Sequence, residues 1–499
     1  MAKTSTNKTA NRQDRGFLLL WIAFIAVYPL IINIFLPKPD LNKYRDAVIS
    51  QGAIHVSGLV FPSPEMVWIF PKVMALAIIT LVSILFVKDR FRIDLPLFLV
   101  IFYIFVSLLS AIFSGDSIQY VLLGGEGRMD GLLYALALSG FFIFSYLLVR
   151  VFKERAALLA AYALIASAVV EAIIVVAQRL GHDFVGQLTI GAHYPVISGT
   201  VGNPGMVAAF LLPVVVLLAS FDFSRYKLNI RVLITINIVL LSIALSLVNN
   251  RSSFYALLMV LFILLIIQYK NFFVYVNIIV ILIAYFSGPA LFPNNVPNHE
   301  RSLTDTRTLS TRLDIWNIAI DIALHTKGQP LIGGGFDALK TGIIKQRKDK
   351  EYIDLFRKER NWPDSVQIDE IRWLSEGEKP SRLDSILVLA HDEKTGHSFS
   401  GVYKVKLDKA HDLFLDRTIT TGLFSALIWL LLYAVPIFTG IRSRNNLLTA
   451  YSLSIAALFL YYLFWFPVPQ VEPIHVALLA AAWGLIYGDS YDEKRNVVA

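Results

Sequence analysis

Residues 232–268 read VLITINIVLLSIALSLVNNRSSFYALLMVLFILLIIQ, two apolar runs separated by the polar break Asn249-Asn250-Arg251-Ser252-Ser253. Each run has roughly the length that a helix needs to cross a hydrocarbon core of about 30 Å. Runs of this kind recur along the chain of 499 residues, which is 56% hydrophobic. Soluble proteins are about 45–50% apolar. The sequence therefore predicts an all-α polytopic membrane protein.

The apolar runs predict about twelve transmembrane helices. They lie near residues 16–36, 66–87, 95–113, 131–149, 156–178, 204–221, 232–249, 252–268, 272–290, 418–440, 447–466 and 473–488. The first run is too long for the apolar region of a cleaved signal peptide and lacks a small-residue cleavage site, so we expect it to be retained. The absence of cysteine excludes disulfides, thiol catalysis and cysteine-ligated metal.

Lys and Arg predict the orientation of these helices, because short cytoplasmic loops carry an excess of them. With twelve spans, the basic loops all fall on one side, and both termini are then cytoplasmic. The formal charge of +8 comes mostly from these loops and gives no reason to expect a nucleic-acid partner. The residues are Lys3, Lys8, Arg12, Arg15, Lys88, Arg90, Arg92, Arg150, Lys153, Arg155, Arg225, Lys227, Arg231, Lys270, Arg442, Arg444, Lys494 and Arg495.

Four segments follow from this topology. Residues 1–290 form a membrane domain of nine helices, 291–417 form one large outer loop before the third-last helix, 418–488 add three helices, and 489–499 form a cytoplasmic tail. Dense charges of both signs between Lys345 and Arg382 suggest a solvated helix in the outer loop. Two β-prone runs, at 385–389 and 402–405, flank a turn-forming segment and predict a small hairpin.

Three arginines, Arg251, Arg312 and Arg128, lie in predicted outer segments close to the ends of predicted helices or helical patterns. A guanidinium at this depth is costly unless it meets an anion or lines a wet cavity. Arg251 could instead be a snorkelling side chain at a helix end. Arginine's planar fork suits bidentate contact with phosphate, so two converging arginines could hold a diphosphate.

His411 lies immediately before the tenth predicted helix, at the membrane surface. An unperturbed imidazole titrates near about pH 6.5, so it can accept a hydroxyl proton at neutral pH. We expect His391 and His397, in the same stretch, to be structural. Asn203 before Pro204 predicts a helix N-cap, and the glycines at 333–335 either permit close backbone approach or offer amides to an anion.

Lys72 and Glu171 are ionisable residues that lie deeper, roughly 9–11 Å below the outer interface on the rise of a helix. Either charge alone in lipid would cost several kcal/mol. We therefore expect them to form a structural intramembrane pair rather than to take part in catalysis.

Taken together, these segments resemble the O-antigen ligase and polymerase family of bacterial membrane glycosyltransferases. The resemblance covers roughly 120–440, and its order and its long outer loop also match. One departure is Asp412, where the family usually has Asn. The matching pieces are Gly202-Asn203-Pro204, Asn250-Arg251-Ser252-Ser253, Arg312-x-x-x-Trp316, Pro330-Leu331-Ile332-Gly333-x-Gly335, Ala410-His411-Asp412-x-x-Leu415 and Thr421-Gly422-Leu423.

The resemblance implies metal-independent transfer of a glycan from an undecaprenyl-diphosphate carrier, at the outer face of the cytoplasmic membrane. His411 would deprotonate or orient the acceptor hydroxyl. Arg251 and Arg312 would neutralise the leaving diphosphate, and Arg128 would be a third residue of this group. Supporting roles fall to Asp412, Asn203, Trp316 and Gly335. No cofactor is expected.

The acceptor stays open: a lipid A core, another lipid-linked repeat or a protein hydroxyl. The first outer loop, 37–65, has only Asp40, Asp46 and Glu65 as carboxylates and no Asp-x-Asp, which disfavours a metal-dependent oligosaccharyltransferase.

Two other classes compete with the transferase. A transporter or lipid-linked glycan flippase would place ionisable residues at mid-membrane. Here the third, fourth and sixth to eleventh predicted helices have none in their interiors. A receptor or scaffold would leave the placement of the arginines and His411 unexplained.

Overall fold

The computed structural model describes residues 12–32, 66–88, 90–125, 128–189, 197–221, 227–268, 271–293, 307–325, 329–346, 348–360, 365–374, 385–404, 407 and 409–497. The predicted first outer loop, 37–65, with Asp40, Asp46 and Glu65, lies outside these residues. So do Lys3, Lys8, Arg225 and Lys270.

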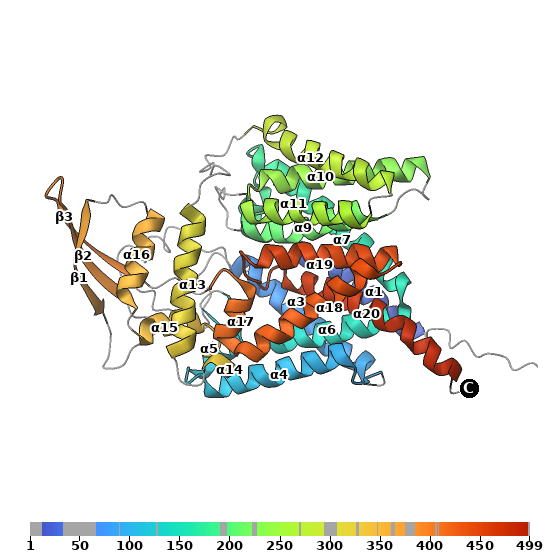
Figure 1. The fold of residues 1–499 in the computed structure, drawn as a ribbon, viewed down its shortest axis with the longest axis horizontal. Coiled ribbons are helices and arrows are strands. Elements are labelled where there is room, and N and C mark those ends of the chain that lie inside the picture. Colours follow the sequence, from blue (N-terminus) through green and yellow to red (C-terminus); the bar gives the residue numbers. More distant parts are fainter. Residues whose placement is uncertain are drawn as a thin grey trace, which may run out of the picture.

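Long helices run side by side in one bundle, with a smaller region at one end of it (Figure 1). Each predicted span has a helix at its position. The bundle contains α1 (Arg12–Val27) with the short η1 (Tyr28–Leu30), α3 (Met66–Val87), α4 (Leu95–Phe113), α6 (Leu132–Phe152), α7 (Glu154–Arg179), α9 (Pro204–Ser220), α10 (Leu228–Leu247), α11 (Arg251–Ile267), α12 (Phe272–Leu291), α18 (Leu423–Arg442), α19 (Asn446–Tyr462) and α20 (Glu472–Val497).

Eight helices among the described residues are long and apolar enough to cross a membrane. Four shorter apolar helices, α9, α11, α19 and the first part of α20, accompany them. The chain is therefore a mostly helical membrane protein with several spans. The count of twelve and the cytoplasmic termini stay predictions.

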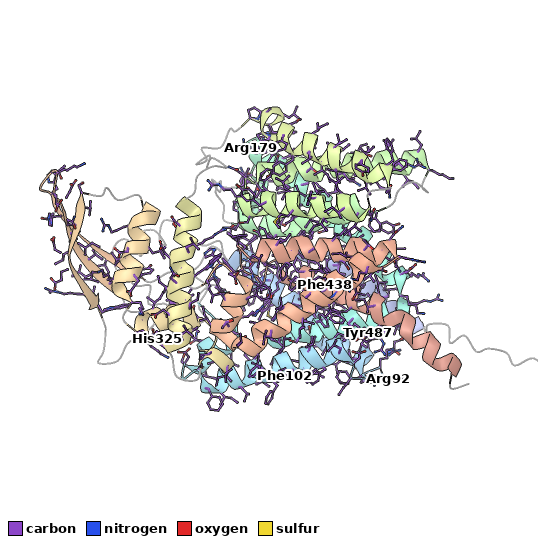
Figure 2. The ribbon with its side chains drawn as sticks, in the orientation of Figure 1. Arg92, Phe102, Arg179, His325, Phe438 and Tyr487 are labelled. Atoms are coloured by element: carbon purple, nitrogen blue, oxygen red, sulfur yellow. The ribbon has the colours of Figure 1, made fainter. Side chains whose placement is uncertain are left out.

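Polar contacts tie the helices together at the end of the bundle far from the smaller region. Arg150 pairs with Asp94 at 2.7 Å, and Arg90 pairs with Asp14 at 2.5 Å. Asp94 also caps α4 by accepting a hydrogen bond from the Leu97 amide. Figure 2 shows Arg92 and Tyr487 at this end and His325 at the other.

The smaller region combines helices with a three-stranded antiparallel sheet in the order β1-β2-β3. Ile343, Ile353, Ile386 and Val388 are buried in a core of its own. Its elements are α13 (Arg307–His325), α14 (Gln329–Ile332), α15 (Ala338–Lys345), α16 (Asp349–Arg360), β1 (Val366–Leu374), β2 (Ser385–Asp392) and β3 (Ser398–Lys404).

The sheet is a small addition to a mostly helical fold. The charged stretch from Lys345 to Arg382, which we expected to be a solvated helix, contains the helix α16 and then strand β1. Strands β2 and β3 pair where the sequence predicts a hairpin, but β1 lies in the stretch that we expected to be helical. An irregularity between Ile368 and Glu370 breaks the register of β1 with β2. The apolar positions therefore lose the alternation by which a strand is recognised.

The predicted helix at 418–440 is two helices, α17 (Leu413–Thr421) and α18, which meet at Gly422. Gly422 has φ 87°, a left-handed conformation that favours glycine. Two short helices, α5 (Ile118–Leu123) and α8 (Phe184–Thr189), lie in predicted outer segments, and α20 continues beyond its predicted end at 488.

Candidate functional site

Arg251 and Arg312 come together at the N-terminus of α11. Arg251 is the first residue of this helix, and the Asn250 side chain caps it by accepting from the Ser253 amide at 2.9 Å. From α13, Arg312 Nη1 donates to Ser252 Oγ at 3.1 Å. Burial lowers the pKa of the Arg312 guanidinium, and the nearby charge of Arg251 acts in the same direction. Two like charges thus share a largely buried place.

A second helix N-terminus lies beside this one. Asn203 caps α9 by accepting from the Gly205 amide at 2.8 Å, and Pro204 is the first helical residue. Tyr461, near the end of α19, links the two helix starts: its hydroxyl donates to the Gly205 carbonyl at 2.7 Å and also hydrogen-bonds the Asn250 side chain. Both helix starts present the positive ends of their dipoles.

His411 immediately precedes α17, and Asp412 caps that helix by accepting from the Leu415 amide at 2.8 Å. The imidazole lies edge-on to two aromatic rings, with centroids 4.8 Å from Phe466 and 5.5 Å from Trp465. Burial raises the pKa of the Asp412 carboxyl to about 6. The histidine is therefore held beside the C-terminal end of α19, next to the Asp412 carboxyl.

The segment 464–466, which follows α19, joins the predicted site residues. The Arg128 guanidinium carbon lies 5.4 Å from the Phe466 ring centroid, so Arg128 and His411 contact the same ring. On α13, Trp316 lies 6.2 Å from Phe464. The Tyr461 and Trp465 rings, also 6.2 Å apart, connect the arginine pair with His411.

The amide of Gly335 binds a backbone carbonyl of α17 and not an anion. The Gly334 and Gly335 amides donate to the carbonyls of Ile419 and Thr420 at 2.7 and 2.9 Å. A Cβ on Gly333 would lie 2.4 Å from the Thr420 oxygen. Of the two roles that the sequence allowed, the glycines serve close backbone approach, and they dock this loop onto α17.

Lys72 and Glu171 are fully buried, and both hydrogen-bond Thr200. Lys72 Nζ donates to the Thr200 carbonyl at 2.9 Å. Glu171 accepts from the Thr200 amide at 2.9 Å and from its hydroxyl at 2.6 Å. The two side chains thus hold the segment that leads to the Asn203 cap, and their purely structural role stays a prediction.

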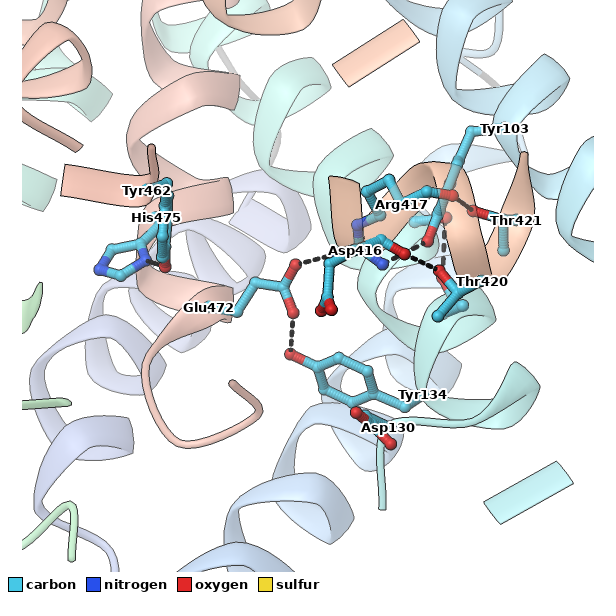
Figure 3. A network of polar contacts seen from close by, with 12 residues as sticks. Tyr103, Asp130, Tyr134, Asp416, Arg417, Thr420, Thr421, Tyr462, Glu472 and His475 are labelled. Atoms are coloured by element: carbon cyan, nitrogen blue, oxygen red, sulfur yellow. Dashed lines mark hydrogen bonds and ion pairs between the residues drawn. The ribbon is translucent and has the colours of Figure 1, made fainter. Parts of the chain in front are cut away.

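A buried polar network that the sequence reasoning missed lies beside α17 (Figure 3). Arg417 Nη2 pairs with Glu472 at 2.5 Å, and its Nη1 donates to the Tyr103 hydroxyl at 3.1 Å. Tyr134 donates to the other Glu472 oxygen at 3.0 Å. Arg417 could have been found by the argument that selected Arg251, because it is another arginine on the predicted outer side.

The network continues towards His411. Lys409 Nζ lies 2.6 Å from Asp130 and 3.6 Å from Asp416, and the Ala410 amide donates to Asp416 at 2.8 Å. These residues line a cavity of ≈ 20 Å³, enough for a water molecule. Among the described residues, no group of three or more His, Asp or Glu side chains is placed to hold a metal ion.

Residues 236–367 match the family described as Wzy_C, O-Antigen ligase. This segment is similar to the O-antigen ligase family. The O-antigen ligase segment runs from α10 to β1 and contains Arg251, Arg312, Trp316 and Gly335. His411, Arg128 and Asn203 lie outside it. No curated protein matches the chain.

The family match implies a bacterial integral membrane glycosyltransferase of the O-antigen ligase and polymerase type, which acts on lipid-linked glycans.

Proposed function

We propose that this protein transfers a glycan from an undecaprenyl-diphosphate carrier to an acceptor hydroxyl at the outer face of the cytoplasmic membrane, without a metal ion. The observation that carries the proposal is the pairing of Arg251 and Arg312 at the N-terminus of α11, next to the N-terminus of α9. Like charges in a largely buried place repel each other, and an anion relieves that cost.

A diphosphate is an anion that can bind both arginines and the two helix N-termini. Its oxygens accept bidentate hydrogen bonds from guanidinium groups, and helix N-termini favour the same charge. When the sugar–oxygen bond breaks, negative charge grows on the leaving diphosphate. Arg251 and Arg312 would stabilise that charge, which is the task of a divalent cation in metal-dependent transferases.

The acceptor chemistry falls to His411. The acceptor oxygen attacks the anomeric carbon of the donor sugar, and the bond from that carbon to the diphosphate oxygen breaks. The imidazole takes the hydroxyl proton, and the carrier leaves as polyprenyl diphosphate. The Asp412 cap and the rings of Trp465 and Phe466 hold the base in place. Another histidine, His475, is buried with its ring nitrogens at Tyr462 and at the Ala209 carbonyl, so it does not fit this role.

The arginines are tested by Arg251→Lys and Arg312→Lys. These substitutions keep the positive charge and remove the planar guanidinium that can bind phosphate through two hydrogen bonds. The assay uses purified protein in nanodiscs with a lipid-linked oligosaccharide and EDTA. We expect kcat/KM to fall about 100-fold in each variant, since charge-assisted bidentate contacts in a transition state are lost. Arg179→Lys is the matched control, a buried arginine at the outer end of α7 that donates to the Phe292 carbonyl.

Near-normal rates in both lysine variants would contradict the diphosphate role. Loss of activity in EDTA that a divalent cation restores would contradict the metal-free mechanism. The products decide among acceptors: a ladder indicates a polymerase, one glycolipid conjugate indicates a ligase, and a protein conjugate indicates protein O-glycosylation.

A further inference from the structure

His411 has a backbone conformation that needs support from its surroundings. Its φ is 56°, in the left-handed region, which costs a non-glycine residue about 1–2 kcal/mol. Met129, next to Arg128, has φ 53° and is in the same region. Two of the proposed site residues thus lie at or beside strained positions, far apart in the sequence and in contact with the same Phe466 ring.

Three charged residues, Lys409, Asp416 and Asp130, connect these positions, and we call them the 409–416–130 clamp. Asp416 lies on α17 and reaches back across His411: one oxygen accepts from the Ala410 amide at 2.8 Å and the other lies 3.6 Å from Lys409 Nζ. Lys409 Nζ also lies 2.6 Å from Asp130, two residues after Arg128. The side chains of Lys409 and Asp416 are about nine-tenths buried.

The local backbone adds to the clamp on both sides of His411. Asp412 caps α17 on the C-terminal side, so the chain is held immediately before and immediately after the imidazole. Near Arg128, a Cβ on Gly124 would lie 2.4 Å from the Asp130 carboxylate, so this turn also packs closely around the clamp. The contacts leave residues 410–412 and 128–130 little freedom to move relative to one another.

We propose that the 409–416–130 clamp positions His411 against Arg128, and that Asp416 is its central positioning residue. The proposal rests on the proposed function, in which His411 receives the acceptor proton. Asp416 touches neither substrate nor carrier in this account. It acts through the backbone of residue 410 and through Lys409. A displacement of the base by about 1 Å can cost about 100-fold in rate.

The test compares Asp416→Leu, which removes both contacts, with Asp416→Asn, which keeps an oxygen for the Ala410 amide. The first readout does not depend on activity: the rate at which diethyl pyrocarbonate modifies His411, measured by mass spectrometry relative to the outer-region His391. The second readout is kcat and the donor KM in the nanodisc assay. The matched control is Asp94→Asn, which breaks the ion pair with Arg150 at the other end of the bundle.

For Asp416→Leu we expect the relative modification rate of His411 to change at least about threefold and kcat to fall about tenfold or more, with the donor KM within about twofold of wild type. Asp416→Asn should change both in the same direction by less. It also serves as the test variant if Asp416→Leu does not fold. Asp94→Asn should change neither readout.

If the Asp416 variants, like Asp94→Asn, change neither the modification rate of His411 nor kcat, the clamp proposal is wrong. This holds whether or not His411→Ala abolishes transfer. If His411 modification changes in the Asp416 variants while His411→Ala keeps full transfer, the clamp holds His411 but the proposed catalytic role is wrong. The two failures are therefore distinguishable.

Discussion

At the scale of single residues, Asp412 shows how a departure from the family pattern can keep the same structure. The family usually has Asn after the histidine, and Asn and Asp cap helices about equally well. Here the Asp412 carboxylate accepts from the Leu415 amide and begins α17. The substitution therefore preserves the cap and adds an ionisable group. Burial raises the pKa of this carboxyl to about 6.

The raised pKa of Asp412 predicts a pH-dependent effect of Asp412→Asn. The folded protein binds this proton more tightly than the unfolded chain, whose carboxyl has the ordinary value of 3.8. The contribution of Asp412 to stability is thus fully present below the ordinary value and is lost as the pH rises through about 6. Asn keeps the cap and does not ionise. The melting temperature of the variant minus that of wild type should therefore increase from about pH 4 to about pH 7 and then level off.

Tryptophan fluorescence during heating in detergent measures this difference. A difference that stays constant across the range would show that Asp412 titrates as in the unfolded chain.

Some site residues could be predicted one at a time, and others could not. Arg251 stands out because it lies in a polar break between two apolar runs, and the structure places it with Arg312 at one helix start. Lys409, Asp416 and Asp130 do not stand out, because Asp130 lies hundreds of residues before its partner. From the sequence alone, a charged residue in a predicted outer loop is expected to be solvated, because its ion-pair partner is known only from the fold.

At the scale of elements, the junction between α17 and α18 depends on Gly422. Its φ is 87°, and a Cβ there would lie 2.0 Å from the Leu331 oxygen. The loop after α14 approaches the same place through the Gly334 and Gly335 amides. Gly396, at the β2–β3 turn, has φ 69° with nothing within 4 Å of a Cβ. Both glycines have a positive φ, and they differ in the space around them.

Gly422→Ala should therefore destabilise the protein more than Gly396→Ala. The control substitution should cost about 1 kcal/mol for the left-handed conformation. Gly422→Ala should cost about 1–3 kcal/mol more, because the added methyl meets backbone atoms that cannot rotate away. Thermal unfolding in detergent measures both variants. Equal losses would mean that the contact of the 331–335 loop with α17 yields easily.

The elements that hydropathy predicts well are the long apolar helices of the bundle. The bounds of α3 and α4 coincide with the predicted runs, since an apolar run and a helix of the same length cross the same hydrocarbon layer. Strand β1 was missed because its irregularity near Ile368 interrupts the alternation. The break at Gly422 was missed because its cause, the Leu331 carbonyl, comes from another element.

At the scale of the whole molecule, the arrangement agrees with the charge pattern of the loops. The region 307–404 and the arginine pair lie at one end of the bundle, and Arg92 and the ion pairs of Asp94 and Asp14 lie at the other (Figures 1 and 2). If the basic end faces the cytoplasm, the candidate site faces outwards. That orientation remains a prediction.

The absence of cysteine makes this orientation directly measurable. Thr395→Cys places a single thiol at the exposed β2–β3 turn, and Asn446→Cys places one at the exposed start of α19. In intact cells an impermeant maleimide should label position 395 and should label position 446 only after permeabilisation. The unsubstituted protein is the blank. The opposite pattern would place the candidate site in the cytosol and contradict the proposed function.

The most direct measurement of the central claim is single-turnover transfer by His411→Ala, with donor binding measured in the same preparation. His391→Ala is the matched control, because His391 pairs with Asp369 in the sheet far from α17. The account predicts that His411→Ala binds the lipid-linked donor within about threefold of wild type and loses transfer by at least about 100-fold, while His391→Ala keeps both. Transfer by His411→Ala at a rate near that of wild type would contradict it.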